Sequence, residues 1–195
     1  MKVSREQAAE NRERIVEIAS RLFREHGFDG IGVADLMKSA GLTHGGFYGH
    51  FDSKEDLMAR ACERALEGSL AKWRERIDAE PGNPLSALAA LYLSSTHCDQ
   101  PGTGCALAAL GSEAARHDPP VRHALTEGLR AFIDVLGGLV PGRSKATRRE
   151  KALATFASMV GAVVLARAVD DPALAEEILQ SVSTSISARP PSAGR

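Results

Sequence analysis

The stretch AGLTHGGFYGHFDSKEDL, residues 40–57, decides the fold of this chain. Gly41 is suited to break a helix, and the leucine after it can fill the turn that follows. The short helix expected next carries Phe47 and Phe51, which are four residues apart and should face a core. Ser53 then heads Ser-Lys-Glu-Asp, a capping-box pattern that predicts the start of another helix.

Two predicted helices precede this stretch. Over residues 5–26 the apolar side chains recur at i, i+3, i+4, i+7 and i+8, which places one apolar stripe on a helix. Gly27 follows where a left-handed residue would end that helix. A second helix starts near Gly32 and runs to Ala40 with the same spacing. Helices in this order, joined by short turns, indicate a helix-turn-helix, in which a recognition helix enters a DNA groove.

The predicted recognition helix opens with residues suited to DNA. Thr43 is placed to cap it, or to reach a phosphate, and His44 can donate to a base edge or a phosphate. Gly45 and Gly46 each cost about 1 kcal/mol of helix propensity relative to Ala, so a pair of them needs a reason. Close approach of the backbone to DNA is one such reason. The alternative is a loose loop with two turn glycines, which the periodic helices on either side disfavour.

Three more side chains complete the expected contacts. Tyr48 lies between the core-facing phenylalanines on a different face of the helix, where its hydroxyl can donate to a phosphate. His50 can do the same, or pack beside Phe51. Lys54 stands in the first turn of the next helix, where its ammonium and the free backbone amides would form an anion site. Otherwise Lys54 is a solvated surface lysine.

The rest of the chain is also predicted to be helical. A long connector helix follows Ser53, and further helices are expected at residues 84–98, 104–117, 119–138, 145–169 and 171–187. No segment alternates apolar and polar residues well enough to indicate a strand. We therefore predict an all-α chain of about nine helices. Its expected parts are a helix-turn-helix domain at 1–52, a helical effector-binding and dimerisation domain at 53–188, and a disordered tail at 189–195.

Composition limits the possible functions. The chain has 24 Lys+Arg against 25 Asp+Glu, so no overall basic field indicates nucleic acid and the DNA prediction depends on local geometry. The polar N-terminus lacks an apolar signal segment and no run approaches 18 apolar residues, so we expect neither secretion nor a membrane span. The three cysteines form no C-x-x-C pair, which fits a reducing cytoplasm. No metal, cofactor or catalytic motif is present in the sequence.

The chain resembles the TetR/AcrR family of transcriptional regulators over about residues 10–58. The motifs that carry the resemblance are Gly27-Phe28, Val33-x-Asp35-Leu36, Ala40-Gly41-Leu42, Phe47-Tyr48-x-His50-Phe51 and Ser53-Lys54-Glu55-Asp56-Leu57. It implies a homodimer that binds an inverted-repeat operator in double-stranded DNA and releases it when a small molecule enters the C-terminal domain. The implied DNA contacts are Thr43, His44, Gly45, Gly46, Tyr48, His50 and Lys54.

The sequence departs from that family at Ile31-Gly32, where a Thr-Thr or Thr-Ser pair is common. A phosphate contact there would have to come from the backbone amide of Gly32 or Val33. In the C-terminal half, the helices near 145–169 and 171–187 are rich in small residues and are expected to form a four-helix dimer interface. Apolar residues of this half are more ordinarily core than effector contacts, and the candidates for both roles include Tyr92, Phe132, Phe156 and Met159.

Cys105 is the chemical candidate of this half. It follows Thr103-Gly104 and opens an apolar helix, whose free amides and dipole would stabilise a thiolate. Some TetR-type regulators of electrophile responses are similar here, with Gly-Cys opening the helix and a segment like Ser112-Glu113-Ala114 beyond it. The ordinary alternative is a small buried cysteine.

Three classes of function remain open at this point. The first is a cytoplasmic repressor that responds to a ligand or to oxidants, and the second is an effector-independent DNA-binding protein of the same fold. The third is an enzyme with Cys105 as nucleophile and His97, His117 or His123 as base. The sequence supplies no oxyanion hole, ordering carboxylate or substrate motif for that enzyme, so we expect a regulator.

Overall fold

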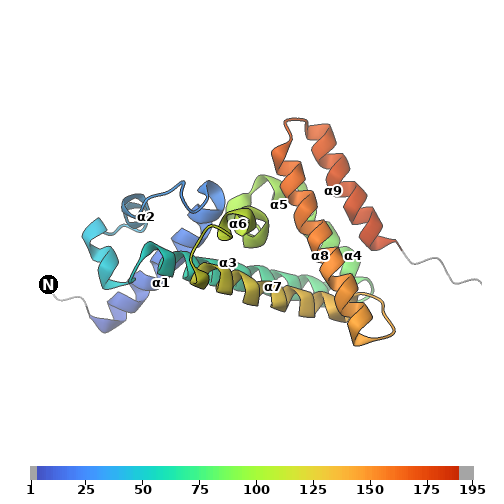
Figure 1. The fold of residues 1–195 in the computed structure, drawn as a ribbon, viewed down its shortest axis with the longest axis horizontal. Helices are drawn as coiled ribbons and strands as arrows, with labels where there is room; N and C mark the ends of the chain where they lie inside the picture. The colour runs from blue at the N-terminus through green and yellow to red at the C-terminus, as the bar shows by residue number, and fades with distance from the viewer. Residues whose placement is uncertain (1–3, 189–195) are drawn as a thin grey trace, which may run out of the picture. The chain divides into compact units, whose positions relative to one another are not determined.

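The structure, a computed structural model, describes residues 4–188, and these form nine α-helices, two 3-10 helices and no strand (Figure 1). The predicted all-α fold is therefore confirmed, while the tail predicted at 189–195 lies outside the described residues. The elements are α1 (Arg5–His26), α2 (Val33–Ser39), η1 (His44–Gly49), α3 (Lys54–Ala79), α4 (Pro84–Tyr92), α5 (Ser95–Asp99), η2 (Pro101–Thr103), α6 (Ala106–Ala114), α7 (Pro119–Leu139), α8 (Lys145–Ala168) and α9 (Pro172–Ser187).

The chain divides by its contacts into two compact units. The first runs to Leu70 and includes Gln100–Arg130, and the second comprises Ala71–Asp99 and the residues from Ala131 onward. The segment that contains α6 thus belongs to the same unit as the helix-turn-helix. The domain boundary predicted after residue 52 concerns a division by function, and it stays a prediction.

The first unit is organised by the signals read in the sequence. The Ser4 hydroxyl accepts a hydrogen bond from the Gln7 amide at 3.1 Å and caps α1, which ends at Gly27 with φ +79°. Gly41, with φ +71°, ends α2 in the same way. The Ser53 hydroxyl accepts from the Asp56 amide at 3.1 Å, which confirms the predicted cap of α3. These local signals bring α1, α2 and η1 together over one apolar core.

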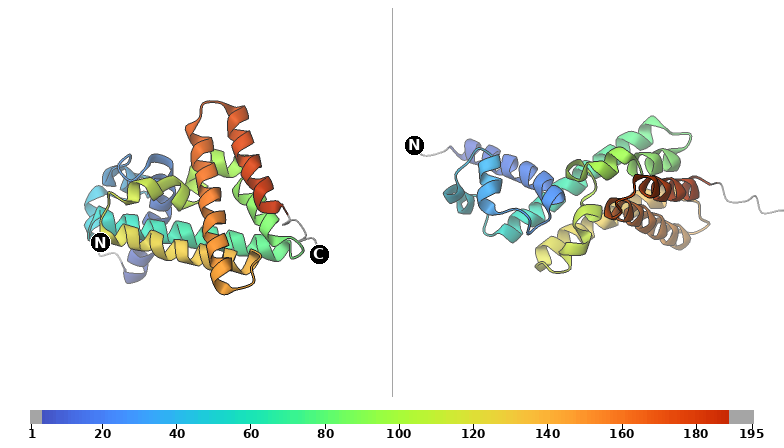
Figure 2. Two further views of the ribbon diagram at one scale, coloured as in Figure 1. Left: turned by 45° about the vertical axis from the view of Figure 1, so that its right-hand side comes forward. Right: turned by 90° about the horizontal axis from the view of Figure 1, so that it is seen from above.

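The second unit packs around Trp73 of α3. The Trp73 ring lies 4.5 Å from that of Phe132, 5.8 Å from that of Phe156 and 5.9 Å from that of Tyr92, measured between centroids. α8 and α9 run side by side in the same unit, as all three views show (Figures 1 and 2). The aromatic side chains therefore form one buried cluster between α3, α4, α7 and α8.

Two predicted helices have different limits in the structure. The helix expected at 84–98 is two helices, because the Ser94 hydroxyl accepts a hydrogen bond from the His97 amide at 3.2 Å and caps α5 separately from α4. The helix expected at 104–117 is only Ala106–Ala114, because Gly104 and Cys105 have extended backbones. The prediction was wrong at both points because a mid-segment serine and a Gly-Cys pair were read as helical.

α8 also differs from expectation. Within residues 4–188 it is the single helix long and apolar enough to cross a membrane by length and composition, although no such segment was expected. Only 33% of that apolar stretch is buried inside the protein. The rest of the stretch is half-buried or exposed, so a core role covers only part of its apolar length.

Candidate nucleic-acid interface

The predicted recognition helix is the 3-10 helix η1. It starts after Thr43, and the Gly46 amide donates to the Thr43 carbonyl at 3.0 Å. It ends where the amides of His50 and Phe51 both donate to the Phe47 carbonyl, at 2.9 and 3.0 Å. In the described chain the Thr43 hydroxyl makes no capping hydrogen bond, so the predicted side-chain cap is wrong. That hydroxyl is exposed instead.

The aromatic residues of η1 and of the segment just after it divide as predicted into a buried pair and an exposed tyrosine. Phe47 and Phe51 are buried with ring centroids 5.5 Å apart, which fixes the segment on the core of the first unit. Tyr48 packs edge-on against Phe47 at 5.2 Å, yet 71% of its surface is exposed. His44 is exposed beside it. The segment therefore presents a tyrosine and a histidine from a firmly anchored backbone.

The glycines of η1 are not required by the protein itself. Among residues 4–188, positive φ angles occur only at Gly27 and Gly41. A Cβ at Gly45 would meet no other heavy atom of the described chain within 4 Å, and one at Gly46 would make only ordinary contacts at 3.7 Å. Each glycine nevertheless costs about 1 kcal/mol of helix propensity. Packing within the described chain therefore does not explain these glycines, whereas close approach of a partner's surface would.

Arg12 of α1 supports the end of η1 and was not identified from the sequence. Its Nε donates to the His50 carbonyl at 3.2 Å, and its guanidinium lies 4.7 Å from the Phe51 ring centroid. It also forms an ion pair with Asp56 at 3.9 Å. Helical periodicity places Arg12 on the polar face of α1 and gives no sign of these long-range contacts.

Lys54 is placed differently from a solvated surface lysine. Its Nζ donates to the Phe28 carbonyl at 2.6 Å and lies 6.0 Å from the centroid of the Phe23 ring. An ammonium has three N–H donors, so this bond leaves capacity for a further acceptor. At the start of α2, the N-cap residue is Gly32, which has no side chain and so cannot cap the helix with one.

The effector candidates fall into two groups. Tyr92, Phe132 and Phe156 meet in the second unit, where the rings of Phe132 and Phe156 stack at 5.2 Å, and Met159 is buried in the same unit. These contacts fit the alternative given in the sequence analysis, in which the four residues belong to the core. Cys105 belongs to the first unit, so the structure does not group it with the other four.

Cys105 is buried immediately before α6, near the half-buried guanidinium of Arg24. The Arg24 guanidinium donates to the Gly104 carbonyl at 2.6 Å and to the Ser20 carbonyl at 2.8 Å. Burial lowers the pKa of Arg24, while its attraction to Cys105, and more weakly to Cys62, opposes that shift. Burial raises the pKa of Cys62 to about 12, although Arg24 acts in the opposite direction. Arg24 thus interacts electrostatically with the thiols of both Cys105 and Cys62.

The fold and the geometry of η1 define a protein of the helix-turn-helix class. Residues 15–61 match the profile of the bacterial regulatory proteins of the tetR family. This segment matches the N-terminal part of that family, and the curated relatives that share it are named as transcriptional regulators.

Known proteins with similar sequences are transcriptional regulators. The chain is 34% identical over 86 residues to the regulator AcrR of Shigella flexneri, a match that covers 44% of this chain and 40% of AcrR. It is 29% identical over 131 residues to the repressor NemR of Escherichia coli K12, covering 65% of each protein. The chain therefore spans less than two thirds of the length of these curated relatives.

Solved structures extend the similarity in fold over almost the whole chain. The reduced form of E. coli NemR aligns with a TM-score of 0.77 at 23% identity, covering 93% of this chain and 99% of that one. A TetR transcriptional regulator from Chloroflexus aurantiacus aligns with a TM-score of 0.72 at 26% identity, covering 93% and 96%. The C-terminal half, where the sequence match is weak, thus shares the family's fold.

Proposed function

We propose that this chain is a cytoplasmic transcriptional repressor that binds double-stranded DNA as a homodimer at an inverted-repeat operator. It leaves the operator when a small molecule or a thiol-reactive compound binds. The observation that carries the proposal is η1, an exposed, glycine-containing segment anchored by two buried phenylalanines. Its relative NemR is described as a repressor, which supports the direction of regulation.

The proposed DNA contacts divide into positioning and reading groups. The hydroxyls of Thr43 and Tyr48, the His50 imidazole and the remaining donors of the Lys54 ammonium would bind phosphates, which fix the register without reading sequence. His44, at the start of η1, would donate to a base edge. Gly45 and Gly46 would let the backbone come within contact distance of the DNA.

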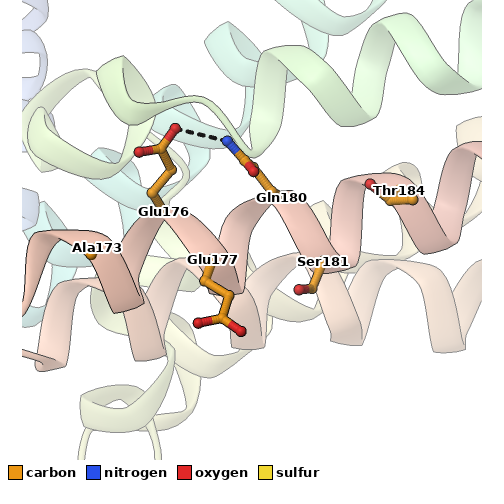
Figure 3. Close-up of a pocket in the computed structure, with 6 residues that line it drawn as sticks. All are labelled: Ala173, Glu176, Glu177, Gln180, Ser181 and Thr184. Atoms are coloured by element: carbon orange, nitrogen blue, oxygen red, sulfur yellow. Dashed lines mark hydrogen bonds between the residues drawn. The ribbon is translucent and has the colours of Figure 1, made fainter.

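The proposed dimer interface lies on α8 and α9. Residues 152–166 of α8 contain no charged side chain, and Leu165 is 57% exposed. Leu153, Val164 and Leu174 are also exposed. A shallow pocket also lies along α9, lined by Ala173, Glu176, Glu177, Gln180, Ser181 and Thr184, with Gln180 donating to Glu176 at 2.7 Å (Figure 3). An apolar strip with a polar margin is the usual composition of a two-fold interface.

The proposed signal reaches the protein at one of two places. Cys105, beside α6 and Arg24, is the candidate for electrophiles and oxidants, and a solved structure of NemR is described as its reduced form. The cluster of Tyr92, Phe132, Phe156 and Met159 is the candidate for an apolar effector, which would have to enter by moving these side chains. A protein of the same fold without any effector is the alternative.

The experiment that tests the proposal is selection of bound fragments from the DNA of the source organism, followed by titration of the selected fragment. Because phosphate contacts release counterions, the logarithm of the binding constant should fall steeply and linearly with the logarithm of salt concentration. An inverted repeat should emerge from the selected fragments. Absent or salt-insensitive binding would contradict the proposal, and binding without release by any electrophile or apolar compound would support the effector-free alternative.

A further inference from the structure

Phe28, two residues beyond the end of α1, is held by polar groups on both sides of its backbone. Its amide donates to Oε2 of Glu113 at 2.8 Å, and its carbonyl accepts from the Lys54 ammonium at 2.6 Å. Its fully buried ring packs edge-on against the His117 ring, with 4.8 Å between centroids. The turn between α1 and α2 is therefore fixed by α6, by His117 in the segment between α6 and α7, and by the start of α3.

Gly27 makes room for the Glu113 carboxylate. A Cβ at this position would lie 3.0 Å from Oε2 of Glu113 and only 2.8 Å from its Oε1, which is closer than real Cβ atoms come to another heavy atom, so the carboxylate would have to shift. The residue also has φ +79°, which favours glycine independently. The missing side chain thus serves two purposes, because it ends α1 and admits a carboxylate onto the turn.

The segment around α6 is fastened to the helix-turn-helix at three points. Before α6, the Gly104 carbonyl accepts from Arg24 of α1 at 2.6 Å. Near its end, Glu113 holds the Phe28 amide. Beyond it, Nδ1 of His117 lies 2.9 Å from Oε1 of Glu55, the residue next to Lys54. Two of these contacts hold the last turn of α1 and the residue that opens the α1–α2 turn, so a displacement of α6 would act on the start of that turn.

We propose that Glu113 is a positioning residue for DNA binding: its carboxylate fixes the α1–α2 turn and so sets the placement of α2 and η1 on DNA. This inference rests on the proposed function. A charge-assisted bond to a buried amide is stronger than a neutral one, and its loss leaves a buried N–H without an acceptor. The carbonyl of Phe28 accepts a hydrogen bond from Lys54, a proposed phosphate ligand. A change at Glu113 would therefore reach this DNA contact through Phe28.

The test uses the full chain and the DNA fragment selected above. Glu113→Ala is compared with wild type and with Glu127→Ala, which removes an exposed carboxylate paired with Arg130 in the same unit. Two quantities are measured: hydrogen exchange of the Phe28 amide without DNA, and the dissociation constant of the DNA complex. We expect Glu113→Ala to speed exchange roughly tenfold and to weaken DNA binding roughly tenfold, about one lost charge-assisted hydrogen bond. The control should match wild type in both.

The two readouts separate a positioning role from a merely structural one. Faster exchange at Phe28 with DNA binding equal to that of Glu127→Ala would overturn the proposal, and so would unchanged exchange. If Glu113→Ala fails to fold, Glu113→Gln replaces it, since the amide keeps one oxygen acceptor and should give a smaller loss of the same kind. Wild-type protein that binds no selected fragment would refute the proposed function itself, and the wild-type titration shows that before any variant is compared.

Discussion

The guanidinium of Arg12 lies 4.7 Å from the centroid of the Phe51 ring, and its Nε donates to the neighbouring His50 carbonyl at 3.2 Å. One side chain of α1 thereby packs on Phe51, just after η1, and donates a hydrogen bond to the carbonyl of the residue that ends η1. Since η1 is a short 3-10 helix, it has few internal hydrogen bonds to hold this end.

We expect Arg12→Ala to destabilise the fold by about 1–2 kcal/mol, the sum of a cation–π contact and a part-buried hydrogen bond. The affinity for DNA should also fall, by the same factor for every DNA sequence, because Arg12 supports η1 and reads no base. Arg12→Lys keeps the charge without the planar donor and should recover only part of the loss. Urea unfolding and DNA titration provide the measurements, with the exposed Arg14→Ala as a control on the same helix. Equal effects of Arg12→Ala and Arg14→Ala would show that charge alone matters.

Tyr48→Phe should separate DNA binding from stability. The ring keeps its contact with Phe47, and the tyrosine is 71% exposed, so unfolding should be unchanged. Loss of a phosphate hydrogen bond should weaken the complex by about 1 kcal/mol, roughly fivefold, on all sequences alike. Titration of the selected operator and of mismatched operators measures both points. A change in the order of preferred sequences would instead assign Tyr48 to base reading.

Gly45→Ala should change stability and DNA binding in opposite directions. The methyl group enters open space at negative φ, so the fold should gain up to about 1 kcal/mol. The same methyl group should obstruct the approach of the backbone to DNA and weaken the complex at least tenfold. Gly68→Ala in α3 is the matched control, because a Cβ there also meets nothing in the described chain within 4 Å. Full DNA affinity in Gly45→Ala would remove the proposed reason for this glycine.

The sequence predicted those parts of the fold that local signals determine. Gly27, Gly41 and the Ser53 cap have local signatures, and each ends or starts its helix where expected. The contacts of Lys54 with Phe28 and of Glu113 with the Phe28 amide join residues 26 and 85 positions apart, so periodicity and spacing could not indicate them. The sequence accordingly predicts the exposed residues of η1 and its two phenylalanine anchors, but not the long-range contacts of Arg12 and Glu113.

Leu165→Glu should convert the proposed dimer into a monomer. Leu165 is 57% exposed on α8, so the charge costs the monomer little, but it would be buried without a partner in an apolar interface. Light scattering coupled to gel filtration measures the mass. Leu91→Glu on α4 introduces the same charge at another exposed leucine and should leave the mass unchanged. A wild-type monomer that binds lipid vesicles would indicate that α8 contacts a membrane instead.

The cysteines should react in an order set by their surroundings. All three are buried, but burial raises the pKa of Cys62 to about 12 and also raises that of Cys98, where Arg167 opposes the shift. Alkylation requires the thiolate, so at pH 7.5 we expect Cys62 to react last, and Cys105, as the proposed sensor, to react first. Labelling of Cys62 in the folded protein should keep rising about tenfold per pH unit up to about pH 12. The unfolded thiol ionises near pH 9.0, so the Cys62 contribution to stability is complete below that pH and is lost between pH 9.0 and about 12. Mass spectrometry of timed, iodoacetamide-quenched samples measures the order, and labelling of Cys105 no faster than Cys62 would return it to the role of a core residue.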